Sequence, residues 1–454
     1  MVKIGLEIHT QLNTKSKIFC SCPNPANLNQ QELKPNSICC PTCLGLPGAK
    51  PVFNKKVLEE ALKVALALNC KINEEIFFSR KTYYYLDLPN SYQVTQYEEP
   101  LATNGQFQEI TIKRVHMEED PGKLIHQGNL VLIDYNRSGT PLIEIVTEPE
   151  FTSPQEVRQF LQNLLTLLEY LGVYNRKSEA SLRVDANIST TGARVEIKNI
   201  GSIKDVEKAL NTEIERQKTN APKEQETRRW DPESQSSILM RTKESELDYG
   251  YIFDGNLPKF TISKEQIEHI KSQLPELHDK KSIRFIKQYK LKPEDAKVLT
   301  SNLRLADFFE KVASKINHNL ASRWFIREIP RILNYNKLTL EEWDISEVEI
   351  TELLDLLQNN KITERTAQKI LEKLSQKRFS PKEYAEKENL LILSSQHKIE
   401  KLCDKVIEEN PKAVKDYKGG EESALNFLFG KVMQLSKGTA DPYKVKEILT
   451  EKLK

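Results

Sequence analysis

Four of the chain's seven cysteines form two close pairs, Cys20 with Cys22 and Cys40 with Cys43. Seventeen residues separate the two pairs. Thiolates in two such pairs are typical of a tetrahedral Zn²⁺ site, and four protein ligands leave no open position for a substrate. The spacing therefore predicts a structural zinc site, and a set of reduced free thiols is the alternative.

The remaining cysteines indicate no second site. Cys39 directly precedes one of the pairs and is a competing ligand, so the sequence leaves its role open. Cys70 and Cys403 are isolated, and such cysteines commonly act as small apolar core residues. An odd number of cysteines clustered in this way also argues against a framework of disulfide bonds.

A second group of chemically capable side chains lies in segments where apolar and polar residues alternate. Residues 2–12, 110–120, 181–189 and 193–199 each show this period of two, which predicts half-buried strands. A turn at 190–192 joins the last two segments into a predicted hairpin. The polar faces carry the following acids and imidazoles: Glu7, His9, His116, Glu118, Asp185 and Glu196.

These residue types are suited to Mg²⁺ and phosphate chemistry. Mg²⁺ takes oxygen ligands, and phosphoryl oxygens bind to cations such as the nearby Arg183 and Lys198. A solvated sheet face with cross-strand ion pairs shows the same alternation. Spacing alone favours the solvated face.

Two further segments combine aromatic residues with cations. Residues 79–97 carry tyrosines beside Arg80 and Lys81, and residues 226–231 carry two arginines before a tryptophan. Aromatic rings can stack on an unpaired base while neighbouring cations hold phosphates. Half-buried tyrosines on an edge strand give the same composition, and the residues alone favour that structural interpretation.

Helical segments between the strands have recognisable starts. Ser153 begins one of them with a capping box that includes Glu156, and Gly172 ends it. Asn54 and Ser202 precede two further amphipathic segments and are expected to cap them. The first part of the chain is therefore predicted to mix helices with strands, whereas the pattern from about residue 263 onward is helical.

The overall composition excludes several classes of protein. The 67 Lys and Arg residues nearly cancel the 65 Asp and Glu residues, so any nucleic-acid contact must come from local patches. No apolar run approaches the roughly 18 to 20 residues of a membrane helix, and we expect a cytoplasmic protein. The chain lacks the motifs GxxxxGK[ST], GxGxxG, HExxH and GxSxG, so an ATP site would be of an unfamiliar type.

Nine ordered segments over some 230 residues resemble the B subunit family of the glutamyl- and aspartyl-tRNA amidotransferases. They read GLEIHTQLNTKSKIFCSC, CPTCLGLPG, RKTYYYLDLP, SYQVTQY, HMEEDPGKLIH, LIDYNRSGTPLIEIVTEP, SLRVDANIS, EIKNIGS and ETRRWD. The later segment ENPKAVKDYKGGEESALNFLFGKVMQLSKGTADP is similar to the YqeY-like tail of that family. Nine motifs in order are far more specific than any single signature.

The resemblance implies ATP-dependent transamidation of mischarged Glu-tRNA(Gln) or Asp-tRNA(Asn). In that family the B subunit phosphorylates the side-chain carboxylate of the tRNA-bound amino acid, and ammonia then displaces the phosphate. The ammonia comes through a channel from the amidase, which is the A subunit, and the small C subunit completes the heterotrimer. ATP, Mg²⁺ and structural Zn²⁺ are the implied cofactors. A non-catalytic, zinc-containing scaffold that binds tRNA is the alternative.

The resemblance also assigns residues, motif by motif. The implied Mg²⁺ ligands, which are also the candidate catalytic residues, are Glu7, His9, Glu118 and Glu196, with Glu119 as the reserve for its neighbour. Contacts to phosphate or to the tRNA end fall on Arg183, Lys198, Arg228 and Arg229, and a structural or metal-shell role falls on Asp185. The zinc ligands are Cys20, Cys22, Cys40 and Cys43.

We expect an α+β fold with three parts. Residues 1–262 would form a cradle-like catalytic domain around an antiparallel sheet. Residues 263–398 would form an all-α helical domain, and residues 399–454 a small helical YqeY-like tail. The two helical domains would hold the tRNA body, mainly through its phosphates.

Overall fold

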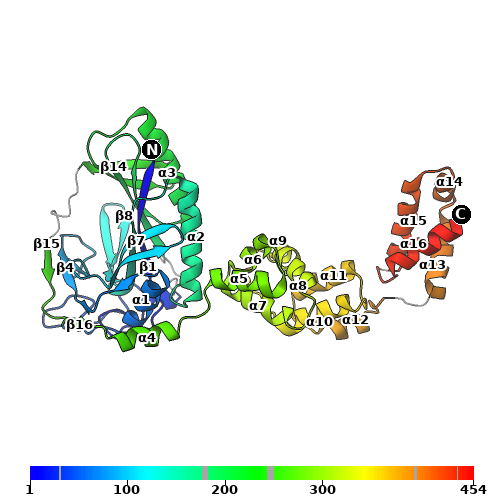
Figure 1. The fold of residues 1–454 in the computed structure, drawn as a ribbon, viewed down its shortest axis with the longest axis horizontal. Helices are drawn as coiled ribbons and strands as arrows, with labels where there is room; N and C mark the ends of the chain where they lie inside the picture. Colours follow the sequence, from blue (N-terminus) through cyan, green and yellow to red (C-terminus); the bar gives the residue numbers. More distant parts are fainter. Residues whose placement is uncertain (30–31, 176–181, 243–249, 393–395, 437, 454) are drawn as a thin grey trace. The chain divides into compact units, whose positions relative to one another are not determined.

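The computed structural model describes residues 1–29, 32–175, 182–242, 250–392, 396–436 and 438–453. The chain forms two compact units, Met1–Leu277 and His278–Lys454 (Figure 1). Residue 181, the expected start of the hairpin, lies outside the described residues, as does residue 395 near the expected end of the middle domain. The division into three domains at residues 262 and 398 stays a prediction.

A nine-stranded sheet forms the centre of the first unit. In spatial order its strands are β14 (Ser236–Thr242), β13 (Glu226–Asp231), β12 (Val195–Ile200), β11 (Leu182–Ser189), β1 (Lys3–Gln11), β10 (Thr140–Thr147), β7 (Ile110–Asp120), β6 (Ala102–Phe107) and β2 (Lys71–Ile72). The predicted antiparallel sheet and the predicted hairpin, β11 with β12, are confirmed. One pair, β12 with β13, is parallel, because a helix crosses over between the two strands.

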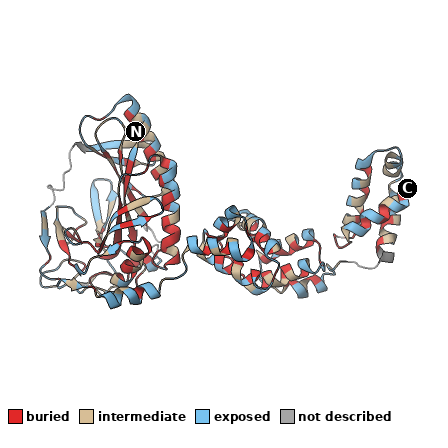
Figure 2. Ribbon diagram, in the orientation of Figure 1, coloured by how far each residue is buried: buried red, intermediate tan, exposed pale blue. Residues whose placement is uncertain are grey.

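Three helices share the core on one face of this sheet: α1 (Lys55–Ala67), α2 (Pro154–Tyr170) and α3 (Ile203–Thr219). Their apolar side chains pack with strand residues such as Ile8, Met117 and Val184, all fully buried. In Figure 2 the buried residues follow the strands and the helix sides that cover them. Because side chains alternate along a strand, the polar residues of the same strands lie on the opposite face.

The predicted helix starts are confirmed. Side-chain oxygens of Asn54, Ser153 and Ser202 accept hydrogen bonds from backbone N–H groups of the first helical turns. The predicted capping box at Ser153 is wrong in one detail, since the Glu156 carboxylate accepts from the N–H group of Thr152, at 2.9 Å. The hydroxyl of Thr152 also donates to this carboxylate. Thr152 therefore gives Glu156 two hydrogen-bond donors, whereas the backbone of Ser153 would give it one.

Smaller elements complete the described part of the first unit. They are the sheet β15 (Gly250–Phe253), β4 (Ser79–Thr82) and β5 (Tyr92–Thr95), the pair β16 (Phe260–Thr261) and β3 (Glu75–Ile76), the hairpin β8 (Lys123–Gln127) and β9 (Leu130–Asp134), and the helices η1 (Pro25–Asn27) and α4 (Lys264–Ser272). The hydroxyl of Thr95 in β5 donates to Glu118 Oε2 of β7 at 3.2 Å. The sheet β15–β4–β5 therefore lies against the polar face of the large sheet.

The second unit is helical, as predicted. Its helices are α5 (His278–Tyr289), α6 (Pro293–Thr300), α7 (Leu303–Ala313), α8 (His318–Arg323), η3 (Trp324–Glu328), α9 (Ile329–Asn336), α10 (Glu347–Gln358), α11 (Glu364–Leu374), α12 (Pro381–Lys387), α13 (Gln396–Glu409), α14 (Pro411–Lys418), α15 (Glu422–Leu435) and α16 (Pro442–Leu453). Helices α13, α15 and α16 share a core of their own. Within the described residues, no helix has the length and apolar character needed to cross a membrane. The α+β fold class is confirmed.

Candidate active-site cleft and cysteine cluster

The central strands bring acids and imidazoles from distant segments into register. His9 of β1 lies opposite Glu144 of β10, which in turn lies opposite His116 of β7. On the other side of β1, Glu7 lies opposite Asp185 of β11. Residues directly opposite one another point to the same face of a sheet. The polar face of the sheet therefore carries these groups in adjacent rows.

Four of these residues form a tight group, which we call the imidazole cluster: His9, His116, Glu118 and Glu144. His9 Nε2 lies 3.1 Å from Glu144 Oε2 and 3.5 Å from Glu118 Oε1. His116 Nε2 lies 3.2 Å from the same Glu144 oxygen. Burial acts to lower the pKa of His9, but the charge and hydrogen bond of Glu144, together with the charges of Glu118 and Asp185, outweigh it and raise that pKa to about 9. Burial acts to raise the pKa of Glu144, but the two imidazoles hold it well below its usual range.

Three carboxylates form a second group, the acid cluster: Glu7, Asp185 and Glu196. One oxygen from each lies within 4.8 Å of the others. Burial, followed by the charges of Glu144, Asp185 and Glu196, raises the pKa of Glu7 to about 7. A cation bound at this cluster would counter both the cost of burying the charge and the repulsion from the neighbouring acids, and would lower this pKa.

Both clusters contribute to one cleft, with a volume of about 310 Å³. Its lining combines acids, cations, amides and aromatic rings: Glu7, His116, Glu118, Glu144, Glu196, Lys81, Arg114, Arg194, Lys198, Thr95, Gln96, Asn187, Gln225, Tyr97 and Tyr251. The volume is at the lower end of the range for small-molecule sites, which is about 300 to 1,000 Å³. Carboxylates beside cations can hold a metal ion and a phosphate together.

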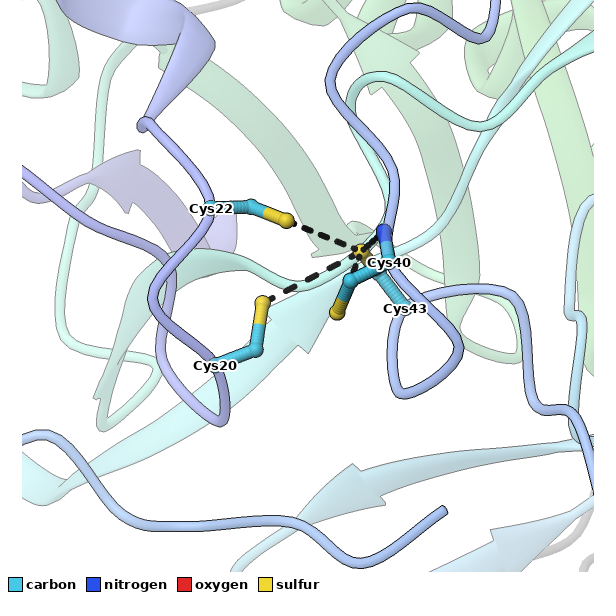
Figure 3. Close-up of side chains that lie close together, drawn as sticks. All are labelled: Cys20, Cys22, Cys40 and Cys43. Carbon is cyan, nitrogen blue, oxygen red and sulfur yellow. Dashed lines mark hydrogen bonds between the residues drawn. The ribbon is translucent and has the colours of Figure 1, made fainter.

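The four paired cysteines of the first unit converge on one point (Figure 3). Cys43 Sγ lies 3.6 Å from Cys40 Sγ, 3.7 Å from Cys22 Sγ and 3.9 Å from Cys20 Sγ. The neighbouring Lys17 is fully buried, and its Nζ has no hydrogen-bond partner among the described residues. The structure thus brings together the four predicted ligands and places a buried ammonium group close by.

Cys39 does not belong to this group of thiols. Its Sγ lies 3.7 Å from Asn136 Oδ1. Burial raises the pKa of the Cys39 thiol to about 11. Its thiol is not among the four whose sulfur atoms all lie within 4.8 Å of one another, which are those of Cys20, Cys22, Cys40 and Cys43. The two isolated cysteines, Cys70 and Cys403, are buried, as the sequence indicated.

The sequence of the chain matches two family models. Residues 2–268 match the GatB/GatE catalytic domain, and residues 307–453 match the GatB domain. The chain belongs to the GatB family. The resemblance found in the ordered sequence segments is therefore confirmed.

Three GatB relatives match this chain over 99% or more of its length. A protein of Carboxydothermus hydrogenoformans is 43% identical over 99% of this chain and 98% of its own length. One of Methanothermobacter thermautotrophicus is 43% identical over 100% of both chains. One of Thermotoga maritima is 41% identical over 99% of this chain and 98% of its own. All three are named as the B subunit of an aspartyl/glutamyl-tRNA(Asn/Gln) amidotransferase.

Most of the residues that the GatB resemblance assigns to Mg²⁺ lie at the cleft. Glu7, Glu118 and Glu196 line it, and His9 contacts Glu118 directly. Lys198 also lines the cleft, with its Nζ 3.3 Å from Glu196 Oε1. The three acids and the imidazole divide between the two clusters, so the role of each as a ligand stays a prediction.

The other three assigned cations do not line the cleft. Arg183 pairs with the buried carboxylate of Asp120, at 2.5 Å. Arg228 lies opposite Ile197 of the core, so its side chain is on the helix-covered face of the sheet. Arg229 is exposed and does not line the cleft. Of these three arginines, Arg183 lies on the polar face, opposite His9 and within the field of the Glu118 and Asp185 charges. The contacts of all three to phosphate or tRNA stay predictions.

The reserve ligand Glu119 points away from the imidazole cluster. Its Oε1 accepts a hydrogen bond from the N–H group of Val94 at 3.0 Å. Burial raises the pKa of Glu119 to about 7. Neighbouring residues of a strand point to opposite faces, so only Glu118 of this acidic pair reaches the cleft.

Sequence reasoning missed Glu144, the carboxylate that both imidazoles contact. It lies in β10, whose eight residues are all buried and show no polar alternation. A signal was nevertheless present, because Glu144 is the only charged residue in this strand. A buried charge requires a partner, so a lone acid in an apolar strand indicates a polar cluster around it.

Proposed function

We propose that this chain is the ATP-using subunit of an aspartyl/glutamyl-tRNA(Asn/Gln) amidotransferase. It transfers the γ-phosphate of ATP to the side-chain carboxylate of a glutamate or aspartate esterified to tRNA, which leaves ADP. Ammonia then attacks the carbonyl carbon and releases phosphate, giving glutaminyl- or asparaginyl-tRNA. The convergence of both clusters on one cleft, in a chain 43% identical to a B-subunit relative over its full length, carries this proposal.

The chemistry explains why the cleft combines acids with cations. A free carboxylate resists ammonia because its oxygen is a poor leaving group, and phosphorylation removes that obstacle. Lys81, Arg194 and Lys198 line the cleft and would bind the phosphoryl oxygens of ATP. The acid cluster alone would repel the same oxygens, so the cleft requires a cation between acids and phosphate.

The residues of the cleft fit Mg²⁺. The observation is the pKa of Glu7, raised to about 7 by burial and by the charges of Glu144, Asp185 and Glu196. A bound cation would lower this pKa. We propose Glu7, His9, Glu118 and Glu196 as its ligands. Bound there, Mg²⁺ would neutralise the charge of the phosphoryl group during transfer. Glu144 contacts His9 and would hold its ring in position.

The cysteine cluster fits structural Zn²⁺. A tetrahedral site with Zn–S bonds of about 2.3 Å has sulfur–sulfur separations of about 3.8 Å. The three separations from Cys43 Sγ, between 3.6 and 3.9 Å, agree with this geometry. Four thiolates on one Zn²⁺ carry a net negative charge, which the buried ammonium of Lys17 would offset. We therefore propose Cys20, Cys22, Cys40 and Cys43 as ligands of a zinc ion that supports the fold.

We further propose that the chain works in a heterotrimer. The amidase, as the A subunit, would supply ammonia through a channel, and the small C subunit would join the other two chains. The helical second unit would hold the tRNA body through its Lys and Arg side chains, with affinity that falls steeply with salt. The division into a catalytic domain, a helical domain and a tail belongs to this proposal.

The test is phosphate release that requires the charged tRNA. The chain, purified with its partner subunits, is mixed with ATP, Mg²⁺ and either Glu-tRNA(Gln) or uncharged tRNA. We expect release only with the charged tRNA. Glu118→Gln removes the charge of a proposed Mg²⁺ ligand that also lies close to both imidazoles. We therefore expect this variant to release phosphate at least about 100-fold more slowly. Glu109→Gln, at an exposed turn, is the matched control and should keep wild-type activity.

Two results would contradict the proposal in different ways. If the wild-type protein binds tRNA but releases no phosphate, the alternative function, a non-catalytic scaffold that binds tRNA, would be supported instead. Full activity of Glu118→Gln would remove the assignment of that ligand while preserving the reaction.

A further inference from the structure

Two tyrosines from distant segments of the sequence meet at the cleft. Tyr97 follows β5, and Tyr251 lies in β15. Their rings stack, with centroids 3.9 Å apart and planes inclined by 13°. Both residues line the cleft that the acids also line. Residues far apart in the sequence thus form one aromatic wall.

The register of the small sheet explains why this wall faces the clusters. Tyr251 of β15 lies opposite Lys81 of β4, which lies opposite Gln93 of β5. These three side chains share one face of the sheet, and Thr95, two residues after Gln93, shares it as well. The Thr95 hydroxyl donates to Glu118 Oε2. The face that carries Tyr251 and Lys81 is therefore directed toward the imidazole cluster.

The opposite face of the same sheet shows a purely structural use of a cation and a ring. Arg80 pairs with the buried carboxylate of Asp254 at 3.0 Å and lies 4.6 Å from the ring centre of Tyr92. Asp254 is 1% exposed, so this cation is engaged in a buried ion pair. Tyr97 and Tyr251 instead border a cavity that also contains cations and carboxylates. Packing alone does not explain an aromatic pair in that position.

We propose that the Tyr97–Tyr251 pair binds an adenine ring by stacking. The inference rests on the proposed function, which brings two adenine rings to this cleft: that of ATP and that of the terminal adenosine of tRNA. Stacking on an aromatic side chain contributes about 1 to 3 kcal/mol per base. The cleft is thereby divided between an aromatic end for the base and an acidic end for the cation and the reacting phosphate.

The first experiment separates base binding from phosphate binding. The complex of the chain with its partner subunits is titrated, in the presence of Mg²⁺, with ATP and with inorganic tripolyphosphate. For Tyr251→Leu and Tyr97→Leu we expect the Kd of ATP to rise about 5- to 150-fold, equivalent to the stacking contribution. The Kd of tripolyphosphate should stay unchanged. Tyr251→Phe should retain ATP binding, because the ring is kept.

A control variant, and a measurement with tRNA as the second possible source of the adenine ring, complete the test. Tyr84→Leu removes a tyrosine that is 84% exposed and does not line the cleft, and it should change neither Kd. If the bound adenine is that of tRNA, ATP binding stays normal and the KM for Glu-tRNA(Gln) rises by a similar factor. Unchanged ATP binding together with an unchanged tRNA KM would overturn the inference, and so would equal loss of ATP and tripolyphosphate binding. A wild-type complex without tRNA-dependent phosphate release would instead contradict the proposed function itself.

Discussion

The cysteine cluster and the cleft gather their charged groups by different routes. The cysteine cluster takes all four thiols from residues 20–43. A backbone hydrogen bond from Lys17 N–H to Cys22 O, at 3.0 Å, helps to shape this short segment. The cleft takes its acids and imidazoles from β1, β7, β10, β11 and β12. The first cluster is local in the sequence, whereas the second depends on the assembly of the whole sheet.

This difference determines which changes to the protein would disrupt each cluster. A slip of one residue in a strand turns every side chain of that strand to the other face, so the cleft requires the correct register of five strands. The cysteine cluster lies within one short segment that hydrogen bonds already shape, and a bound metal would join its two ends directly. The two clusters should therefore respond to different perturbations, and variants can separate them.

The largest expected effect is that of Cys43→Ser. Cys43 Sγ lies within 3.9 Å of each of the other three sulfur atoms, so its loss opens the site. We expect the zinc content, measured by metal analysis, to fall from one ion per chain to nearly zero. The Tm should fall by roughly 10 °C, which corresponds to a few kcal/mol for a unit of this size. Cys70→Ser, which changes a thiol outside the cluster, should keep the zinc.

The second largest effect is that of Glu144→Gln, which perturbs the cleft alone. The change keeps the volume of the side chain and removes the charge that both imidazoles contact. We expect tRNA-dependent phosphate release to fall at least about 100-fold, as for the partner of a metal-binding histidine. Zinc content should stay at one ion per chain. Wild-type turnover, or a parallel loss of zinc, would contradict the independence of the two clusters.

Local features of the molecule could be predicted from the sequence. The four cysteines, the helix caps and the polar faces of β1 and β7 each depend on residues that are close together in the chain. Register-dependent features could not be predicted. No local pattern indicates that Arg183 turns to Asp120 or that Tyr97 stacks on Tyr251. Such pairs are decided when strands far apart in the chain align.

The face of an individual side chain was also predictable only where alternation is regular. Arg228 and Arg229 are neighbours in β13 and have the same chemistry, so the residues themselves do not distinguish the two. The register with β12 decides the face of each, because it places Arg228 opposite the core residue Ile197 and Arg229 opposite Lys198.

A smaller effect is expected for Lys17→Met at the cysteine cluster. The variant keeps the buried stem and removes the ammonium group that would balance the thiolates. We expect the zinc affinity, measured by competition with a chelator, to fall about 10- to 100-fold, as for other residues that support metal ligands. Lys15→Met, at an exposed position two residues away, is the matched control. Equal zinc affinity in the Lys17→Met and Lys15→Met variants would contradict an electrostatic role for Lys17.

The smallest expected effect tests whether a raised pKa is by itself a mark of the cleft. Glu60 lies in α1, outside both clusters, and is 6% exposed. Burial raises its pKa to about 7, although Lys56 and Lys63 act to lower it. Between about pH 4.5 and pH 7 the folded protein therefore holds a proton that the unfolded chain has lost, so stability falls as the pH rises through this window.

Glu60→Gln removes this penalty. We expect its free energy of unfolding, measured in urea, to exceed that of the wild type by on the order of 1 kcal/mol at pH 8, and the two to agree at pH 4.5. Mg²⁺ should leave the difference at pH 8 unchanged, because Glu60 does not line the cleft. For Glu7, whose pKa is also raised to about 7, Mg²⁺ should remove the penalty of ionisation. If Mg²⁺ changed the difference in free energy of unfolding between Glu60→Gln and the wild type, the ion would not distinguish the acids of the cleft from an ordinary buried acid.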